Sequence, residues 1–246
     1  MTPSYLQPFV LPTEPATRTR VGSIDGYLPA GEDRCPAIVF VHGGPIPVTL
    51  EPPSEWPVYV GYGQAVAARG IVGVVFNHPL RTLSDYGPSA ADLIAVIDAV
   101  RTHPRVDPER VALWFFSGGG PLATPWLDAT TEQVRCLAFT YPLLGDRPAH
   151  PLDARFLPVR ALADWQGVPI VLTRVGLERA DVAETVAEFL AGAASEKVPV
   201  QVIDVPNGHH GFDFLDDSDE SRAAITEAID AVQAHLVAEG ERVSER

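Results

Sequence analysis

Three kinds of side chain in this 246-residue chain could together carry out nucleophilic catalysis. Ser117 ends an apolar run and stands directly before three glycines, Glu178 follows a later apolar run, and His209 and His210 come further on. A serine hydroxyl becomes an effective nucleophile when a base takes its proton, and a histidine base works best when a carboxylate fixes its tautomer. The chain therefore contains a candidate nucleophile, base and acid.

The residues around Ser117 predict a strand, a sharp turn and a helix. Residues 111–116 are apolar, residues 118–120 are glycines, and Pro121 fits the first turn of a helix. A serine at such a turn projects its hydroxyl beyond the end of a sheet, and the Gly118 N–H lies beside it at a helix N-terminus. We therefore expect chemistry at this turn.

The rest of the chain alternates strand-like and helix-like patterns. A weakly alternating stretch at 19–33 predicts an edge hairpin, and apolar runs predict buried strands within 36–44, 71–78, 134–144, 168–176 and 198–205, the first of them ended by glycines. Helical patterns occupy 64–69, 89–103, 180–195 and 221–240. Strands that alternate with helices at this spacing predict an α/β fold with a mostly parallel sheet and helices on both faces.

Two local predictions concern the region before Ser117. The proline-rich stretch 45–63 is interpreted as a stiff loop. In the helix over 89–103, Ser89 is the expected N-cap and Pro104 the expected stop. The residues expected on the buried face of this helix are Leu93, Ile94, Ile97 and Val100.

We predict a single domain with short appendages. Residues 1–18 carry four prolines and are expected to run extended over the surface, whereas 19–240 form the domain. Residues 145–167 lack a clear period, which indicates a short cap-like insertion rather than a large lid. Residues 241–246 form a charged tail.

Composition narrows the class of partner. The chain has 18 basic and 32 acidic residues, a balance that disfavours nucleic acid and anionic membrane surfaces. Cys35 and Cys136 lie at or within strand-like runs and are expected to be reduced core residues. The N-terminus has no basic and apolar leader, and no apolar run reaches the roughly 18 residues of a membrane span. We therefore expect a cytoplasmic protein that acts on a small molecule.

Three motifs resemble those of a known family. The sequence HGGP at 42–45 resembles an oxyanion loop, SGGG at 117–120 resembles the second half of a nucleophile elbow, and NGHHGFD at 207–213 resembles the loop that delivers a catalytic histidine. From about Val21 to the C-terminal helix, the chain resembles small serine α/β-hydrolases of the dienelactone-hydrolase-like group. The resemblance implies a single-domain α/β-hydrolase fold and hydrolysis of a carboxylic ester, lactone or thioester of modest size.

The sequence departs from this family at the elbow. The family motif is G-x-S-x-G, but Phe115 stands two residues before Ser117, and Gly119 keeps only the second glycine. Dienelactone hydrolases themselves use a cysteine nucleophile. Because neither cysteine of this chain lies at an elbow, that chemistry is not carried over.

The family order of nucleophile, acid and base matches Ser117, Glu178 and a following histidine. His210 precedes Gly-Phe as in the family's H-G-F pattern, so it is favoured over His209 as the base. Glu178 occupies the position where relatives carry G-x-Asp, and Asp181 and Asp146 remain rival acids. These assignments are what the resemblance implies.

The oxyanion hole is expected to use the Gly118 N–H together with an N–H of Gly43 or Gly44, because Pro45 has none. His42 is expected to brace this loop rather than act as a second base, and His78 to lie at a strand end or pocket. Side chains that could line a substrate pocket are His42, His78, His209, Phe116, Trp56 and Tyr141.

Other functions are kept open. A peptidase or acyltransferase could use the same residues, and a non-catalytic member of the fold could bind ligands without turnover. The histidines lack the spacing of a metal site, so neither a metal nor another cofactor is expected. A homodimer is compatible with the sequence.

Overall fold

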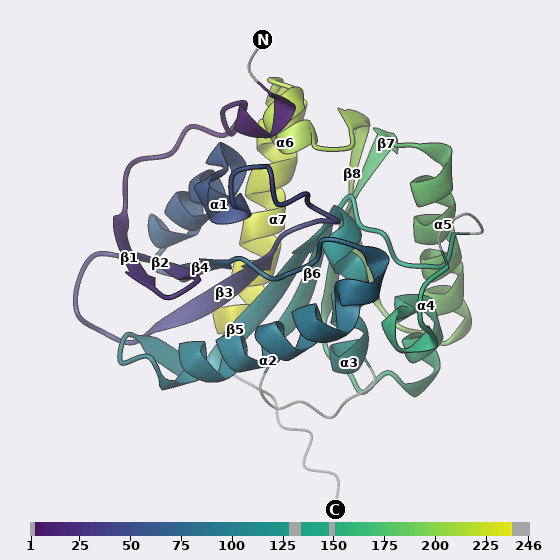
Figure 1. The fold of residues 1–246 in the computed structure, drawn as a ribbon, viewed down its shortest axis with the longest axis horizontal. Helices are drawn as coiled ribbons and strands as arrows, with labels where there is room; N and C mark the ends of the chain where they lie inside the picture. Colours follow the sequence, from purple (N-terminus) through teal and green to yellow (C-terminus); the bar gives the residue numbers. More distant parts are fainter. Residues whose placement is uncertain (1–2, 128–133, 148–150, 238–246) are drawn as a thin grey trace, which may run out of the picture.

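The apolar runs form one eight-stranded sheet in the computed structural model, which describes residues 3–127, 134–147 and 151–237 (Figure 1). The spatial order is β1-β2-β4-β3-β5-β6-β7-β8. The strands from β4 across to β8 are parallel, and the hairpin β1–β2 adds antiparallel to β4. The strands are β1 (Thr17–Val21), β2 (Ile24–Leu28), β3 (Cys35–Val41), β4 (Val72–Phe76), β5 (Val106–Phe116), β6 (Cys136–Thr140), β7 (Ile170–Leu177) and β8 (Val200–His209).

Helices cover both faces of this sheet (Figure 1). Alternate residues of β3 point to opposite sides: Val39 packs with α2 and α5, whereas Phe40 packs with α1 and α7. The helices are α1 (Pro57–Ala67), α2 (Tyr86–Thr102), α3 (Thr124–Leu127), α4 (Pro158–Ala161), α5 (Ala180–Ser195), α6 (Phe212–Leu215) and α7 (Asp219–Val237). Short 3-10 turns are η1 (Ser4–Leu6), η2 (Pro53–Glu55), η3 (Leu83–Asp85), η4 (Ser117–Ala123), η5 (Ala154–Phe156) and η6 (Leu162–Asp164).

The predicted fold class is confirmed: the chain is a single-domain α/β fold with a mostly parallel sheet between two helical layers. Cys35 and Cys136 are both free thiols, as expected, although Cys35 is only half-buried. None of the helices in the described residues is long and apolar enough to cross a membrane. The last residues of the predicted C-terminal helix, 238–240, and the charged tail at 241–246 lie outside the described residues.

The prediction of a loop up to residue 63 is wrong, because α1 already begins at Pro57. Two glycines in this helix disfavour it locally but permit close packing. A Cβ on Gly61 would lie 2.2 Å from the Phe9 ring, and one on Gly63 would lie 2.3 Å from the Tyr27 ring. Tertiary packing therefore stabilises a helix that local propensity does not predict.

Helix α2 also departs from the prediction at two residues. It begins at Tyr86, directly after a capping box in η3, so Ser89 is a buried residue of the helix and not its N-cap. Ile94 is 51% exposed, and Val96 takes its place on the buried face with Leu93, which a 3.6-residue period accounts for. The helix ends at Thr102, just before Pro104, as expected.

The carboxyl ends of the parallel strands carry the polar residues singled out above. Ser117 directly follows β5, Glu178 follows β7, His210 follows β8, and His42 follows β3. In an open parallel sheet these ends meet at one edge, which is where ligands bind. The topology therefore brings together segments that are far apart in the sequence.

Candidate active site

Ser117 has a strained backbone at the end of β5. Its φ is +49°, a left-handed conformation that few residues other than glycine adopt. Phe115, which stands where the family motif has glycine, is fully buried and stacks on Phe139 with ring centroids 5.5 Å apart. The turn at Ser117 therefore forms without the first glycine of that motif.

The three glycines after Ser117 are required by close approach of other backbone segments. A Cβ on Gly118 would lie 2.0 Å from the Gly44 carbonyl oxygen, and one on Gly119 would lie 2.6 Å from that of His42. A Cβ on Gly120 would lie 2.3 Å from the Leu143 carbonyl oxygen. This turn and the HGGP loop are therefore packed backbone to backbone.

A continuous hydrogen-bond relay runs from Ser117 through His210 to Glu178. The Ser117 Oγ lies 2.7 Å from His210 Nε2, and His210 Nδ1 lies 2.6 Å from Glu178 Oε2. The Glu178 side chain is only 4% exposed. Because a carboxylate accepts, His210 Nδ1 carries the proton and Nε2 is free to accept from the serine hydroxyl.

The rival candidates contact other partners. His209 is 58% exposed, and its Nδ1 lies 3.0 Å from an oxygen of Asp216. Asp181 pairs with Arg147 and Arg179, which hold the pKa of its carboxyl below the ordinary value. Asp146 accepts from backbone N–H groups of its own loop. The structure thus brings together Ser117, His210 and Glu178 and leaves these three aside.

Two backbone N–H groups beside Ser117, those of Gly44 and Gly118, lack acceptors in the described residues. The Gly43 N–H donates to the Tyr59 hydroxyl at 3.2 Å, so it already has a partner. The Gly44 N–H has no acceptor in the described part of the chain, and its nitrogen lies 3.2 Å from the position of a Cβ on Gly118. The Gly118 N–H belongs to the first turn of η4, where no intrahelical acceptor exists.

His42 and His78 form a buried stack behind the HGGP loop. Their ring centroids are 3.6 Å apart and the planes differ by 6°. The His42 Nδ1–H donates to the Gly43 carbonyl oxygen at 2.6 Å, and the His78 Nε2–H donates to the His42 carbonyl oxygen at 3.0 Å. Burial lowers the pKa of His42 well below its ordinary value and that of His78 to about 4, so both rings are neutral.

The side chains predicted to line a pocket lie in different surroundings. His42, His78 and Phe116 are buried, and the rings of His42 and Phe116 both contact Tyr59 of α1. Trp56 is half-buried, donates from Nε1 to the Glu51 carbonyl oxygen at 2.8 Å, and packs against Tyr5 of the N-terminal segment with the ring planes tilted by 37°. Tyr141 lies against the relay, with its ring centroid 4.7 Å from that of His210.

One buried carboxyl near the relay has no counterpart among the predicted site residues. Asp213 is fully buried (0% exposed) and accepts hydrogen bonds from the hydroxyls of Tyr62 and Tyr141. The only signal in the sequence is an acidic residue inside the apolar segment FDFL. Its two hydroxyl partners are distant in sequence, so the cluster could not be inferred from spacing.

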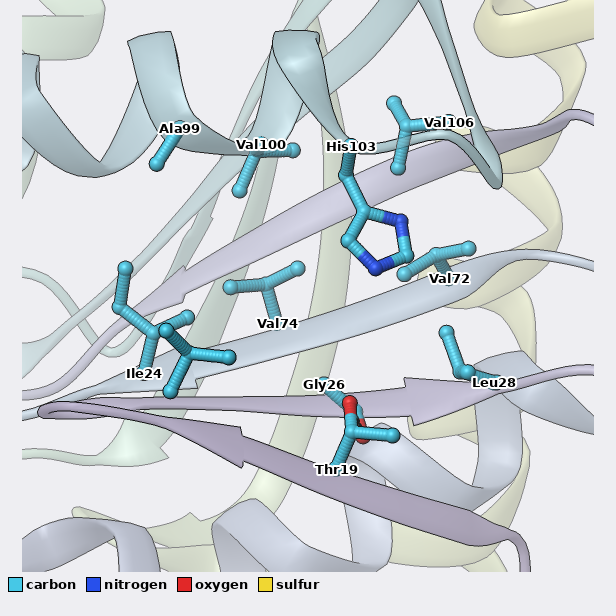
Figure 2. Close-up of a pocket in the computed structure, with 11 residues that line it drawn as sticks. Thr19, Ile24, Gly26, Leu28, Val72, Val74, Ala99, Val100, His103 and Val106 are labelled. Atoms are coloured by element: carbon cyan, nitrogen blue, oxygen red, sulfur yellow. Dashed lines mark hydrogen bonds between the residues drawn. The ribbon is translucent and has the colours of Figure 1, made fainter.

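One apolar hollow lies away from this edge of the sheet. It lies between the β1–β2 hairpin, β4 and the end of α2, with His103 and Val106 beside it (Figure 2). Val106 is the first residue of β5, so the hollow is at the opposite end of that strand from Ser117. No group of three or more His, Cys, Asp and Glu side chains in the described residues is placed to hold a metal ion.

Gly118→Ala tests the close approach of the Gly44 backbone to Gly118, the residue after Ser117. The added Cβ would overlap the Gly44 carbonyl oxygen, so the free energy of unfolding is expected to fall by about 1–3 kcal/mol. Any ester hydrolysis should fall by on the order of 10²- to 10³-fold, because the N–H groups beside Ser117 would shift. Chemical denaturation and initial rates measure the two effects.

Gly87→Ala is the matched control for that substitution. Gly87 lies in the first turn of α2, and nothing stands within 4 Å of the added Cβ. The control is expected to leave rates unchanged and stability equal or slightly higher. Equal behaviour of the two variants would show that the approach of Gly44 to Gly118 has no energetic consequence.

Comparison with known proteins supports the fold. Neither a protein-family model nor a curated protein sequence matches the chain. A thermophilic esterase from Thermogutta terrifontis, solved with butyrate bound, matches with a TM-score of 0.68 at 18% identity, over 94% of this chain and 96% of that one. The structure named DphMB1 matches with a TM-score of 0.68 at 20% identity, over 92% and 88% of the two chains.

An acylaminoacyl peptidase from Pyrococcus horikoshii matches with a TM-score of 0.67 at 17% identity, over 95% of this chain and 44% of the peptidase. The similar structures thus include esterases and peptidases, and the fold that they share with this chain is the α/β-hydrolase fold. Identities this low show the fold and leave the reaction to the residues of the site.

Proposed function

We propose that the protein is a serine hydrolase that cleaves carboxylic esters, lactones or thioesters of modest size through an acyl-enzyme. The observation that carries the proposal is the relay from Ser117 Oγ to His210 Nε2 at 2.7 Å and from His210 Nδ1 to Glu178 Oε2 at 2.6 Å. A strained serine at a strand–helix turn, followed by a free N–H, supports the same chemistry.

In the first half-reaction Ser117 Oγ attacks the carbonyl carbon while His210 Nε2 takes the hydroxyl proton. Glu178 holds Nδ1–H and stabilises the imidazolium that forms. The negative charge on the former carbonyl oxygen is placed toward the N–H groups of Gly118 and Gly44, which we favour over Gly43 because the Gly43 N–H already donates to Tyr59.

The tetrahedral intermediate then collapses, and the bond between the carbonyl carbon and the leaving oxygen or sulfur breaks. His210 gives its proton to the leaving group, which departs as an alcohol or thiol. In the second half-reaction His210 takes a proton from water, and the resulting hydroxide attacks the acyl carbon. The bond between that carbon and Ser117 Oγ then breaks, His210 gives its proton to Oγ, and the acid is released. Apart from substrate and water, each step uses only the three side chains and the two N–H groups.

The size of the substrate is inferred from the segment between β6 and β7. Its described part forms short turns and α4, which packs against α3 and α5 and adds no large lid. The Thermogutta terrifontis esterase was solved with butyrate and with propionate, which supports short acyl groups for this fold. We therefore propose short-chain esters, and lactones of similar size, as substrates.

A substrate panel tests this function and its alternative. We expect p-nitrophenyl acetate and butyrate to be hydrolysed with kcat/KM at least about tenfold above the decanoate ester. Aminoacyl p-nitroanilides test the peptidase alternative. This alternative is retained because the structure is similar to that of the Pyrococcus horikoshii acylaminoacyl peptidase. Preference for the anilides would favour a peptidase, and binding without turnover of any compound would favour a non-catalytic member of the fold.

A further inference from the structure

A buried polar cluster lies directly behind His210. The Asp213 carboxylate accepts from the Tyr141 hydroxyl at 2.9 and 3.0 Å and from the Tyr62 hydroxyl at 3.1 Å. Tyr62 comes from α1, Tyr141 directly follows β6, and Asp213 lies in α6, so three separate elements converge. In the described residues no Lys or Arg forms an ion pair with this carboxylate.

Only one of the two tyrosines touches the relay. The Tyr141 ring centroid lies 4.7 Å from that of His210, with the planes tilted by 50°. Its backbone φ is +39°, and its N–H donates to the Thr173 carbonyl oxygen at 3.0 Å. The Tyr62 ring instead packs on Trp114 and Phe116 in the core. The same carboxylate therefore holds one ring against His210 and another away from it.

We propose that Asp213 is a positioning residue for His210, which acts by holding the Tyr141 ring against the imidazole so that Nε2 stays aligned with Ser117. The proposal rests on the hydrolase function proposed above. Its role is distinct from that of Glu178, which contacts Nδ1 directly. The charge on the cluster also favours the imidazolium that forms during attack.

The charge of the cluster is set by its surroundings. Burial raises the pKa of Asp213 to about 7, against hydrogen bonds from Tyr141 and Tyr62 and attraction to His210, which favour the carboxylate. The groups that face it are Tyr62 and Tyr59 of α1, Tyr141 after β6 and His210 after β8. Near neutral pH the carboxyl therefore changes between a form that accepts two hydroxyls and a protonated form that accepts fewer.

The backbone of Asp213 is held as well. Its carbonyl oxygen accepts from the Val10 N–H at 2.9 Å, which ties the N-terminal segment to α6. Gly211, between His210 and α6, has φ +87° and makes the tight turn from which α6, with Asp213, begins. The fold therefore supports this carboxyl from both its side chain and its main chain.

Three single variants separate a positioning role from general core packing. Asp213→Asn and Tyr141→Phe are each expected to lower kcat by about 10- to 100-fold with KM changed less than about threefold. Tyr62→Phe removes a hydroxyl from the same carboxylate without touching His210, so it should lower kcat by less than about threefold. The double variant Asp213→Asn with Tyr141→Phe should be no slower than either single variant.

Stability gives a second readout. The folded carboxyl titrates near pH 7 and the unfolded one near its ordinary 3.8, so the unfolded chain loses its proton first as pH rises. The burial of Asp213 therefore costs stability increasingly between about pH 4 and about pH 7. Asp213→Asn is expected to gain Tm relative to the wild type over this window while it loses kcat. A purely structural role predicts an unchanged kcat per folded molecule, whichever way Tm moves.

A spectroscopic signature keeps the test independent of turnover. The Nδ1 proton of His210, shared with Glu178, should give a downfield ¹H NMR resonance that disappears in Glu178→Gln. We expect this resonance to shift or broaden in Asp213→Asn and Tyr141→Phe and to persist in Tyr62→Phe. If all three variants keep it and keep kcat, or if Tyr62→Phe is as impaired as Tyr141→Phe, the positioning role is excluded. Failure of wild type to hydrolyse any ester would instead reject the proposed function, and the resonance would still decide the role of Asp213.

Discussion

Ser117→Ala is expected to lower kcat for ester hydrolysis by on the order of 10⁵- to 10⁶-fold while the protein stays folded. In the proposed mechanism this hydroxyl forms the acyl-enzyme, and it lies 2.7 Å from His210 Nε2. Because the remaining residues cannot replace it, the residual rate should come from the N–H groups and binding alone. Initial rates with p-nitrophenyl butyrate measure the loss, and burst kinetics should disappear.

Ser117→Gly separates lost chemistry from altered folding. The serine has φ +49°, which glycine adopts without strain, so the free energy of unfolding is expected to rise by about 1 kcal/mol. The variant should be as inactive as Ser117→Ala and yet more stable. Such a pairing would show that strain at residue 117 is tolerated for function. Retention of more than about a tenth of the wild-type rate in either variant would mean that another residue attacks the substrate.

Glu178→Gln is expected to lower kcat by on the order of 10³- to 10⁴-fold with little effect on KM. An amide can present its N–H₂ to His210 Nδ1, which places the ring proton on Nε2, the nitrogen that must accept from Ser117. The buried position of Glu178, with its side chain 4% exposed, leaves no room for water to take over this contact. Steady-state kinetics over the pH range of activity measures the effect.

Asp181→Asn is the control for Glu178→Gln, because Asp181 is a rival candidate for the acid. This residue lies three positions further on but pairs with Arg147 and Arg179 at the surface. We expect it to change kcat by less than about twofold, because exposed ion pairs contribute little. If Asp181→Asn were the slower of the two variants, the acid would have been assigned to the wrong residue.

The sequence predicts those parts of the site that depend on local patterns. The turn at Ser117 follows an apolar run and precedes three glycines, and the strand order brings the carboxyl ends of β5, β7 and β8 to one edge. The nucleophile and base candidates therefore stand at positions that local rules indicate. The choice among Glu178, Asp181 and Asp146 needs coordinates, because all three follow strands and only contacts distinguish them.

Other parts depend on residues that are distant in the sequence. Helix α1 is not predicted from 57 to 63 because Gly61 and Gly63 weaken it locally, and Phe9 and Tyr27 stabilise it from other segments. Asp213 and its hydroxyl donors are 72 and 151 residues apart, so neither spacing nor periodicity indicates the cluster. The Tyr59 hydroxyl likewise accepts from the Gly43 N–H only in the folded chain. The sequence alone therefore does not distinguish Gly43 from Gly44 as the proposed oxyanion donor.

The central claim is that the Ser117 hydroxyl, activated by His210 and Glu178, forms a covalent intermediate. A fluorophosphonate probe followed by proteolysis and mass spectrometry tests it most directly, because such a probe forms a covalent adduct with an activated serine hydroxyl. We expect a single adduct on the peptide that contains Ser117 in the wild type, a much slower adduct in Glu178→Gln, and none in Ser117→Ala. Labelling that persists in Ser117→Ala, or an adduct mapped to another residue, would contradict the account.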